Sequence, residues 1–183
     1  MSELTVYHGI LDNNTGEEIE RVLFLDIDGV MVIDYSKENR DEDHTHLFNP
    51  IAVNLLNKIV EITNCHIVIS SSWRKRDLAW IRKVFTDRAF IYSDRIIGET
   101  MRGYHFVERG AHLPIPRGVE IKAWCDLFIR KTKTGFSNDN YQYAILDDDS
   151  DMLLEQKDNF VKTRHEDGLT IAEANRVIYI FNN

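Results

Sequence analysis

The sequence predicts an α/β fold in which helices cover both faces of a parallel β-sheet. Short apolar runs rich in β-branched residues alternate with longer segments whose apolar residues recur at helical spacing. Strands separated by helices are typical of βαβ units, which build parallel sheets. The chain has 183 residues, of which 43% are hydrophobic, and this suits one domain with a buried core. We therefore expect a single domain over residues 1–183.

Each predicted element has its own local signal. Residues 22–25 form the first apolar run, which predicts a buried strand. Asn49 and Pro50 mark the start of the first helix, because Asn is favoured as an N-cap and Pro at the first helical position. Thr170 is the predicted N-cap of the last helix. The pattern also predicts strands at 67–69, 90–92, 143–146 and 160–161, helices at 77–85 and 117–131, and loop or a small hairpin at 93–115.

Apolar residues at helical spacing support two of these helices. In the helix that begins at Pro50, they are Ile51, Leu55, Leu56, Ile59 and Ile62. The helix at 117–131 carries Val119, Ile121, Trp124 and Leu127 or Phe128.

Charge is distributed unevenly along an acidic chain. The sequence carries 22 Lys and Arg against 30 Asp and Glu, and the net charge of −8 excludes a uniformly basic nucleic-acid-binding coat. Residues 73–133, however, carry 14 basic and 7 acidic side chains, a net charge of +7. This middle segment either forms a positive face beside an acidic centre or consists of ordinary solvated helix faces.

The cysteines and the apolar runs bear on cellular location. Cys65 and Cys125 lie in apolar surroundings, far apart, and without the spacing of a metal site. We expect both to be reduced core residues of a cytoplasmic protein. The acidic N-terminal segment has no signal-peptide pattern, and no apolar run reaches the roughly 20 residues that a membrane span needs. We therefore expect no membrane association, and no obligate protein partner is inferred.

Two carboxylates follow the first predicted strand. Ligands of parallel α/β sheets bind at the carboxyl ends of the strands, so residues at these ends are candidates for a site. Asp26 and Asp28 directly follow the apolar run, and Gly29 allows a sharp turn after them. One carboxylate can act as nucleophile and magnesium ligand and the other as general acid and base. The alternative, an Asp-rich turn without function, is disfavoured by the strand before it and the Gly-Val after it.

Hydroxyl groups and an arginine follow the second predicted strand. Ser70, Ser71 and Ser72 offer hydroxyl and backbone N–H groups, which suit phosphate oxygens. Arg74 can add a charge-assisted contact. The alternative is that the serines only cap the following helix.

A cation stands at the start of the helix predicted at 117–131. Arg117 opens this helix, where a positive charge opposes the helix dipole. That conflict indicates another task, such as neutralising a phosphoryl group. Lys122, about one turn further along, is the alternative cation, and for both residues an ordinary surface charge is the alternative interpretation.

Four carboxylates crowd the end of the strand predicted at 143–146. They are Asp147, Asp148, Asp149 and Asp151. Unpaired carboxylates this close would repel one another, so a bound cation is the simplest explanation. Mg²⁺ takes oxygen ligands and usually keeps several waters. The alternative, an acidic helix start, applies to Asp149 and Asp151 more than to Asp147.

These strand-end groups, in this order along the chain, resemble the motifs of the haloacid-dehalogenase-like (HAD) hydrolase superfamily. The matching residues are Asp26-Ile27-Asp28-Gly29-Val30 for the first motif, Ser70 for the second, Arg117 for the third, and Asp147 with Asp148 or Asp151 for the fourth. The resemblance spans about residues 21–165 and implies a Rossmann-like HAD core. The runs FLDIDGV, ISSSWR, RGVEIKAW, ILDDDSDM and DGLT further resemble the HAD domain of RNA-repair proteins and, loosely, the 3′-phosphatase domain of phage polynucleotide kinase-phosphatase.

The resemblance implies a phosphatase with Mg²⁺ as its cofactor. Asp26 would attack the phosphorus and form an aspartyl-phosphate. Asp28 would protonate the leaving oxygen and then activate water, and its presence argues for phosphate chemistry rather than dehalogenation. Mg²⁺ would be held by Asp26, the backbone carbonyl of Asp28, Asp147 and Asp148. The phosphoryl group would be bound by Ser70 or Ser71 and by Arg117 or Lys122, with Arg74, Arg76 and Asp151 as candidate substrate contacts.

The lengths of the connecting segments bear on substrate size. Family members with small substrates usually carry a cap domain, but neither 30–48 nor 93–115 is long enough for a large one. We expect an open site with a flap at 30–48 and a small lid at 93–115. In the flap, His44 and His46 lie beside acidic residues, yet we expect solvated loop there rather than a zinc site. His165 is expected at a loop surface.

An open site admits a polymer end, so the predicted substrate is a phosphorylated nucleic-acid end, 3′ or 5′, or a nucleotide. The candidate backbone contacts are Arg74, Lys75, Arg76, Arg95, Arg102 and Arg109. Candidate base-stacking residues, unless they pack in the core, are Trp73, Tyr92, Tyr104 and Phe106. The alternatives are a phosphatase for small metabolites or phosphoproteins and a HAD-fold binding module without turnover, which would not need the three aspartates Asp26, Asp28 and Asp147.

Overall fold

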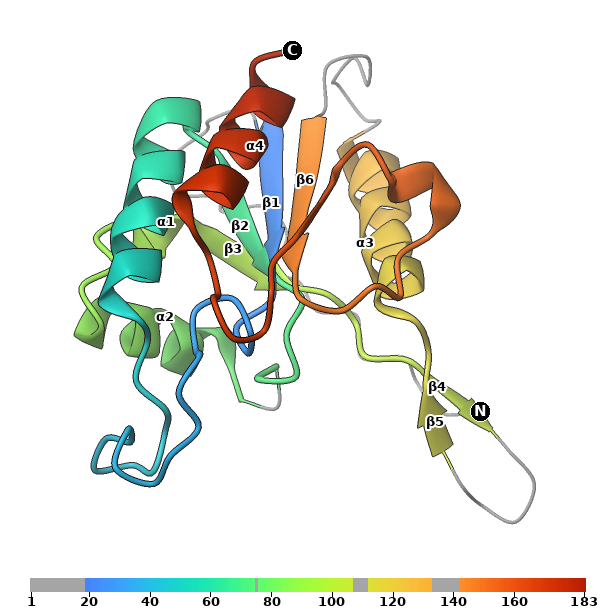
Figure 1. Ribbon diagram of the computed structural model, residues 1–183. Coiled ribbons are helices and arrows are strands. Elements are labelled where there is room, and N and C mark those ends of the chain that lie inside the picture. The colour runs from blue at the N-terminus through green and yellow to red at the C-terminus, as the bar shows by residue number, and fades with distance from the viewer. Residues whose placement is uncertain (1–18, 75, 107–111, 133–141) are drawn as a thin grey trace.

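A five-stranded parallel sheet forms the centre of the protein, in the order β3-β2-β1-β6-β7 (Figure 1). This computed structural model describes residues 19–74, 76–106, 112–132 and 142–183. The strands of the sheet are β1 Arg21–Leu25, β2 His66–Ile69, β3 Ile96–Glu99, β6 Gln142–Asp147 and β7 Phe160–Lys162. The helices are α1 Pro50–Thr63, α2 Leu78–Asp87, α3 Arg117–Thr132 and α4 Ile171–Phe181.

The two faces of the sheet are buried by different helices. Side chains of β1 alternate, with Leu23 and Leu25 on the face covered by α1, α2 and α4, and with Val22 and Phe24 on the opposite face. The second face packs against α3, whose Trp124 meets the ring of Phe24 edge to face at 5.3 Å. The predicted Rossmann-like sheet with helices on both faces is confirmed.

The predicted helix starts are confirmed by their capping contacts. Asn49 Oδ1 accepts a hydrogen bond from the backbone N–H of Ile51 at 2.9 Å, with Pro50 at the first helical position. Thr170 and Glu173 form a reciprocal capping box at the start of α4. Each cap satisfies N–H groups that the first helical turn leaves without partners.

The helices that the apolar spacing predicted, α1 and α3, are formed, but only some of the spaced residues are buried. In α1, Leu56 and Ile59 are buried, whereas Ile51 and Ile62 are 63% and 53% exposed. The buried stripe of α1 comprises Ala52, Val53, Leu56, Ile59, Val60 and Thr63, and it belongs to the core that α4 and the sheet also form. In α3, Ile121 and Trp124 are buried, whereas Val119 and Leu127 are exposed.

The strand predicted at 90–92 is not formed. Ala89 adopts a positive φ of 65° as α2 ends, and Phe90 turns inward onto the ring of Phe85. A short 3-10 helix, η1 Ser93–Arg95, follows, and the edge strand is β3, Ile96–Glu99. The predicted lid at 93–115 is therefore partly core.

A small antiparallel hairpin follows the edge strand. Its strands are β4 Tyr104–Phe106 and β5 His112–Pro114, and it projects away from the sheet (Figure 1). Residues 107–111 between them lie outside the described part of the chain. The small hairpin that the sequence allowed within 93–115 is therefore formed by β4 and β5.

The flap between β1 and α1 is held against α2. Arg88, at the end of α2, forms an ion pair with Asp41 at 2.7 Å and donates to the backbone carbonyl of His46. His44 is exposed, and in the described residues no group of potential metal ligands includes it. The flap is thus an irregular loop that Arg88 anchors to α2, rather than a domain.

Neither cysteine forms a disulfide bond in the described residues, which agrees with the prediction of reduced cysteines. Cys65 is buried and Cys125 is partly buried. No helix in the described ranges is both long and apolar enough to cross a membrane. The N-terminal segment for which no signal peptide is expected, residues 1–20, lies outside the described part of the chain except for its last two residues.

Candidate active site

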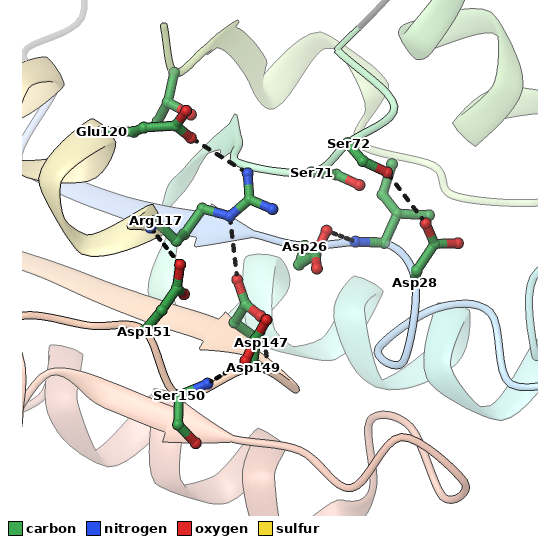
Figure 2. Close-up of polar contacts among 12 residues, drawn as sticks. Asp26, Asp28, Ser71, Ser72, Arg117, Glu120, Asp147, Asp149, Ser150 and Asp151 are labelled. Atoms are coloured by element: carbon green, nitrogen blue, oxygen red, sulfur yellow. Dashed lines mark hydrogen bonds and ion pairs between the residues drawn. The ribbon is translucent and has the colours of Figure 1, made fainter. Parts of the chain in front are cut away.

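The carboxyl ends of three neighbouring strands bring the candidate residues together. Asp26 follows β1 directly, and its backbone N–H donates to the carbonyl of Leu146 in β6 at 3.0 Å. Ser70 follows β2, and its N–H donates to the carbonyl of Leu25 at 2.9 Å. Asp147 is the last residue of β6. The parallel register therefore places these distant sequence segments side by side (Figure 2).

An acidic cluster occupies this edge of the sheet. Ligand oxygens of Asp26, Asp147 and Asp148 lie within 4.8 Å of one another. Asp147 is fully buried, and its Oδ2 has no hydrogen-bond partner among the described residues. Burial, and then the charge of Asp26, raises the pKa of Asp147, and burial likewise raises the pKa of Asp26. The cluster thus holds buried carboxylates that need a positive partner to stay ionised.

The donor set fits Mg²⁺. Three carboxylates supply hard oxygen ligands, which Mg²⁺ prefers. The orphaned Oδ2 of Asp147 is an additional acceptor that a cation would satisfy. Asp26, Asp147 and Asp148 are therefore the residues that would hold the ion. The sequence prediction named these three together with the backbone carbonyl of Asp28. The side chain of Asp28 is not part of this cluster.

Asp28 is half-buried, near enough to Asp26 for its charge to raise the pKa of that carboxyl, and is held by two side chains. Its carboxylate oxygens each accept from Trp73 Nε1 at 3.1 Å, and Oδ2 also accepts from Ser72 Oγ at 3.3 Å. The indole of Trp73 packs in turn against Phe48 and Trp80. Sequence reasoning offered Trp73 only as a stacking or core residue and missed this contact. Its position three residues after the strand-end Ser70 was the available signal.

Substituting Trp73 with Phe is expected to lower kcat for the predicted phosphatase reaction about tenfold or more. A hydrogen bond to a charged group contributes about 1.5–3 kcal/mol. The ring would still fill the space beside Phe48, while Asp28 would lose its donor. Trp80→Phe is the matched control, because Trp80 packs against Trp73 without touching Asp28 through its ring nitrogen. Circular dichroism checks that both variants fold. Equal kcat for Trp73→Phe and wild type would contradict the idea that Trp73 positions Asp28 through this hydrogen bond.

Of the two candidate serines, Ser71 faces the nucleophile candidate. A hydrogen bond from the Ser71 side chain lowers the pKa of Asp26, against the larger effect of burial. Figure 2 shows the Ser71 side chain beside Asp26. Both serines are fully buried, but the Oγ of Ser70 has no hydrogen-bond partner among the described residues. The geometry therefore favours the Ser71 hydroxyl for a phosphoryl oxygen.

Arg117 rather than Lys122 reaches the cluster. Its Nε lies 3.6 Å from Asp147 Oδ2, and its guanidinium points toward Asp26 (Figure 2). Its NH1 lies 3.4 Å from Glu120 Oε2. Lys122 is half-exposed and pairs with Glu155 at 3.3 Å on the outer side of α3. Of these two candidate cations, Arg117 is therefore the one that lies at the acidic cluster.

Arg74 occupies the interior rather than the entrance that its sequence position suggested. Its NH1 pairs with Glu120 Oε2 at 2.8 Å, with 4% and 3% of the two side chains exposed. It also donates to the Ser71 and Thr100 carbonyls. A buried arginine that is already paired is poorly placed to bind substrate, because losing its partner would leave an uncompensated charge. Glu120, which sequence analysis missed, joins Arg74 to Arg117.

The other cationic candidates have different surroundings. Arg76 is exposed, with its guanidinium 4.9 Å from the ring of Trp80. Arg102 lies 5.3 Å from the ring of Tyr104, at the base of the hairpin. Arg95 contacts the ring of buried His66. Lys75 and Arg109 lie outside the described residues.

Asp149 and Asp151 shape the loop after β6. Asp151 Oδ2 accepts from the backbone N–H of Arg117 at 2.7 Å, and this holds the start of α3. Asp149 donates its backbone N–H to Asp147 Oδ1 at 2.9 Å. Both residues thus position Arg117 and Asp147, and the observed contact of Asp151 is with the backbone rather than with the open site.

The contact that His165 makes was also missed, as were those of Trp73 and Glu120. His165 lies at a loop surface as predicted, but its Nδ1 is 2.6 Å from Asp148 Oδ2. No periodic pattern marks His165, and the signal available was its place shortly after the last strand of the sheet.

Comparison with known families agrees with this geometry. A family model described as the HAD domain in Swiss Army Knife RNA repair proteins matches residues 22–174, from β1 into α4. No curated protein and no solved structure matches the chain. The matched range contains Asp26, Ser71, Arg117 and Asp147. The chain therefore belongs to the HAD superfamily, in the family of HAD domains of Swiss Army Knife RNA repair proteins.

Proposed function

We propose that this protein is a Mg²⁺-dependent phosphomonoester hydrolase that forms an aspartyl-phosphate on Asp26 and acts on phosphorylated nucleic-acid ends or nucleotides. The observation that carries the proposal is the clustering of Asp26, Asp147 and Asp148 at the sheet edge, with Arg117 facing them. Membership in a family of RNA-repair HAD domains supports a nucleic-acid end as the substrate.

The chain's own residues would bind and orient the phosphoryl group. The Arg117 guanidinium and the Ser71 hydroxyl lie beside Asp26 and would contact the phosphoryl oxygens, where charge develops in the transition state. Mg²⁺, when bound by the three aspartates, would neutralise further negative charge. Glu120 and Asp151 would keep Arg117 in place through its side chain and its backbone N–H.

Two aspartates would divide the chemistry. A carboxylate oxygen of Asp26 would attack phosphorus as the bond from phosphorus to the leaving oxygen breaks, and Asp28 would give its proton to that oxygen. Asp28, now a carboxylate, would then take a proton from water as the water oxygen attacks phosphorus. This second step releases inorganic phosphate and restores both residues. Trp73 and Ser72, which donate hydrogen bonds to Asp28, would hold its carboxyl group in place beside the leaving group.

The hairpin base supplies the contact that favours a nucleic-acid substrate. Gly103 N–H donates to Glu120 Oε1 at 2.9 Å, so the hairpin leaves the fold beside the side chain that contacts Arg117. Next to it, Arg102 lies over Tyr104, which is 50% exposed. An arginine and an accessible aromatic ring are groups that bind a phosphate backbone and stack on bases.

Phosphate release from a substrate panel tests the proposal. The panel contains p-nitrophenyl phosphate, mononucleotides, sugar phosphates, phosphopeptides, and RNA and DNA oligonucleotides with a 3′- or 5′-phosphate. We expect the highest kcat/KM for one class of oligonucleotide end, and loss of turnover in EDTA. Turnover of small phosphates alone would overturn the substrate assignment. No turnover of any member by folded, Mg²⁺-supplied protein would overturn the hydrolase assignment.

Arg102→Ala is expected to lower kcat/KM several-fold for oligonucleotides, and to reduce its salt dependence, while sparing p-nitrophenyl phosphate. Arg176→Ala is the matched control, because Arg176 lies over Tyr179 in α4 with the same 5.3 Å separation. Both variants lose one positive charge and one cation–π contact. An equal loss in the two variants, or a loss shared by p-nitrophenyl phosphate, would argue against a substrate contact at Arg102.

A further inference from the structure

A stacked pair of aromatic rings lies against the acidic cluster. The ring of Tyr35, in the flap, and the ring of His165, after β7, are 5.1 Å apart with an interplanar angle of 5°. His165 Nδ1 lies 2.6 Å from Asp148 Oδ2. The pair therefore connects the flap with one of the three candidate metal ligands.

In the contact between His165 and Asp148, the histidine ring is the hydrogen-bond donor. An ionised carboxylate only accepts hydrogen bonds, so the ring nitrogen that faces it carries the proton. The 2.6 Å separation is short even for a bond to a charged group. This bond engages one oxygen of Asp148 and restricts rotation of its carboxylate plane. Asp148 is 18% exposed, so water competes for this bond only in part.

Tyr35 is itself fixed to the turn that follows the two catalytic candidates. Its hydroxyl accepts from the backbone N–H of Gly29 at 2.7 Å and donates to the carbonyl of Val32 at 3.0 Å. The ring that stacks on His165 is therefore held by backbone groups rather than by mobile side chains.

Because Gly29 has no side chain, the side chains of Asp148 and His165 can pack closely against this turn. The φ of Gly29 is +68°, and a Cβ there would lie 2.2 Å from Asp148 Oδ2 and 2.8 Å from His165 Nδ1. Any larger residue would push apart the hydrogen-bonded pair. The hydrogen bond between His165 and Asp148 therefore lies where three segments meet. These are the turn after Asp28, the flap and the segment after β7.

From this geometry we propose that His165 is a positioning residue that holds Asp148 in the orientation for binding a divalent cation, with Tyr35 fixing the His165 ring. The inference rests on the proposed function, because the cation is the one that the hydrolase would use. Hydrogen-bond partners behind metal ligands commonly change metal affinity by about 10–100-fold when removed. His165 is 54% exposed, so its replacement leaves no buried cavity.

Binding of Mn²⁺ alone, without substrate, tests the proposal directly. Free Mn²⁺ is followed by electron paramagnetic resonance during titration of the full chain, since Mn²⁺ binds the same hard oxygen ligands as Mg²⁺. We expect His165→Leu to weaken binding about tenfold or more. His165→Asn should restore most of the affinity, because its side-chain amide nitrogen can take the place of Nδ1 as donor. Tyr35→Leu should weaken Mn²⁺ binding less than His165→Leu does. Tyr35→Phe should weaken it less still, because Phe keeps the ring that stacks on His165.

Control measurements separate positioning from general damage. His44→Asn changes an exposed flap histidine with a positive φ of 59°, a conformation that Asn tolerates, and should bind Mn²⁺ like wild type. Unfolding temperatures without metal should agree between His165→Leu and His165→Asn. Equal Mn²⁺ affinity in His165→Leu and wild type, or equal weakening in His165→Leu and His165→Asn, would overturn the donor role.

The same titration distinguishes this inference from the proposed function. Tight Mn²⁺ binding by wild type, weakened in His165→Leu and without turnover of any phosphomonoester, would support the positioning role and overturn the hydrolase assignment. Hydrolysis by wild type, together with unchanged Mn²⁺ affinity in His165→Leu, would support the hydrolase assignment and overturn the positioning role. Wild-type protein that binds no divalent cation would overturn both.

Discussion

Asp26→Asn is expected to abolish phosphate release, with kcat reduced about 10⁴-fold or more, the scale of loss seen when a nucleophile is removed. Asn has the shape of Asp but no negative charge with which to attack phosphorus. Its Oδ1 can still accept from the backbone N–H of Ile27, as Asp26 Oδ1 does at 2.8 Å. The variant removes a buried carboxylate whose charged form is disfavoured by burial, so the fold should tolerate it.

Asp149→Asn is the matched control, because it is the same substitution two residues from Asp147 on a side chain outside the acidic cluster. Its Oδ1 accepts from the Ser150 N–H at 2.8 Å, a contact that Asn can keep. Rapid acid quenching after mixing with a ³²P-labelled substrate adds a direct readout. We expect an acid-stable, hydroxylamine-labile phosphoprotein from wild type and none from Asp26→Asn. Labelling of Asp26→Asn, or activity above about 1% of wild type, would assign the nucleophile elsewhere.

The sequence was sufficient to place the acidic cluster because the sheet is parallel. Asp26 and Asp147 are far apart in the chain, but each ends an apolar strand, and the β1–β6 register pairs Leu25 with Leu146 just before them. Apolar runs locate strands, and the parallel arrangement brings their carboxyl ends to one edge. Strand-end residues are therefore the part of such a site that a single sequence can predict.

Contacts made across loops could not be predicted in the same way. His165 and Trp73 follow strands but act through side-chain direction, which no periodicity encodes. The count of positive charges in residues 73–133 likewise did not reveal that Arg74 turns inward to Glu120. Whether an arginine lies at the surface or in a buried ion pair depends on a partner from a distant segment. The edge strand β3 was misplaced because a nearby apolar run, at 90–92, packs inward without pairing.

Asp147→Asn is expected to remove divalent-cation binding and phosphate release while stabilising the metal-free protein at neutral and alkaline pH. Asp147 is fully buried, and burial followed by the charge of Asp26 raises its pKa. A raised pKa in the folded state means that the folded protein binds a proton more tightly than the unfolded chain. The stability contributed by this proton is fully present below the ordinary Asp pKa near 3.9 and is lost as pH rises through the folded pKa. Wild type without metal should therefore become less stable from about pH 4 upward, and Asp147→Asn should lose this pH dependence.

Thermal unfolding in EDTA, at a series of pH values, measures this difference. At pH 8 we expect the metal-free Asp147→Asn variant to exceed wild type by at least about 1 kcal/mol, which corresponds to roughly 2–4 °C at this chain length. The gap should narrow as the pH falls below the ordinary Asp pKa near 3.9, where the wild-type side chain is protonated in both states. Asn keeps the Oδ1 that accepts from the Asp149 N–H, so that bond does not confound the comparison.

Added Mg²⁺ should reverse the order of the two proteins. A ligand that binds only the folded state raises its stability according to its concentration relative to its Kd, and only wild type keeps all three carboxylates. Asp149→Asn should respond to Mg²⁺ as wild type does, since its side chain lies outside the cluster. A metal-free Asp147→Asn protein that is less stable than wild type at pH 8 would identify Asp147 as a structural anion for Arg117, whose Nε lies 3.6 Å away. A gain in metal-free stability together with loss of the Mg²⁺ response would instead show that the buried charge is kept for the cation.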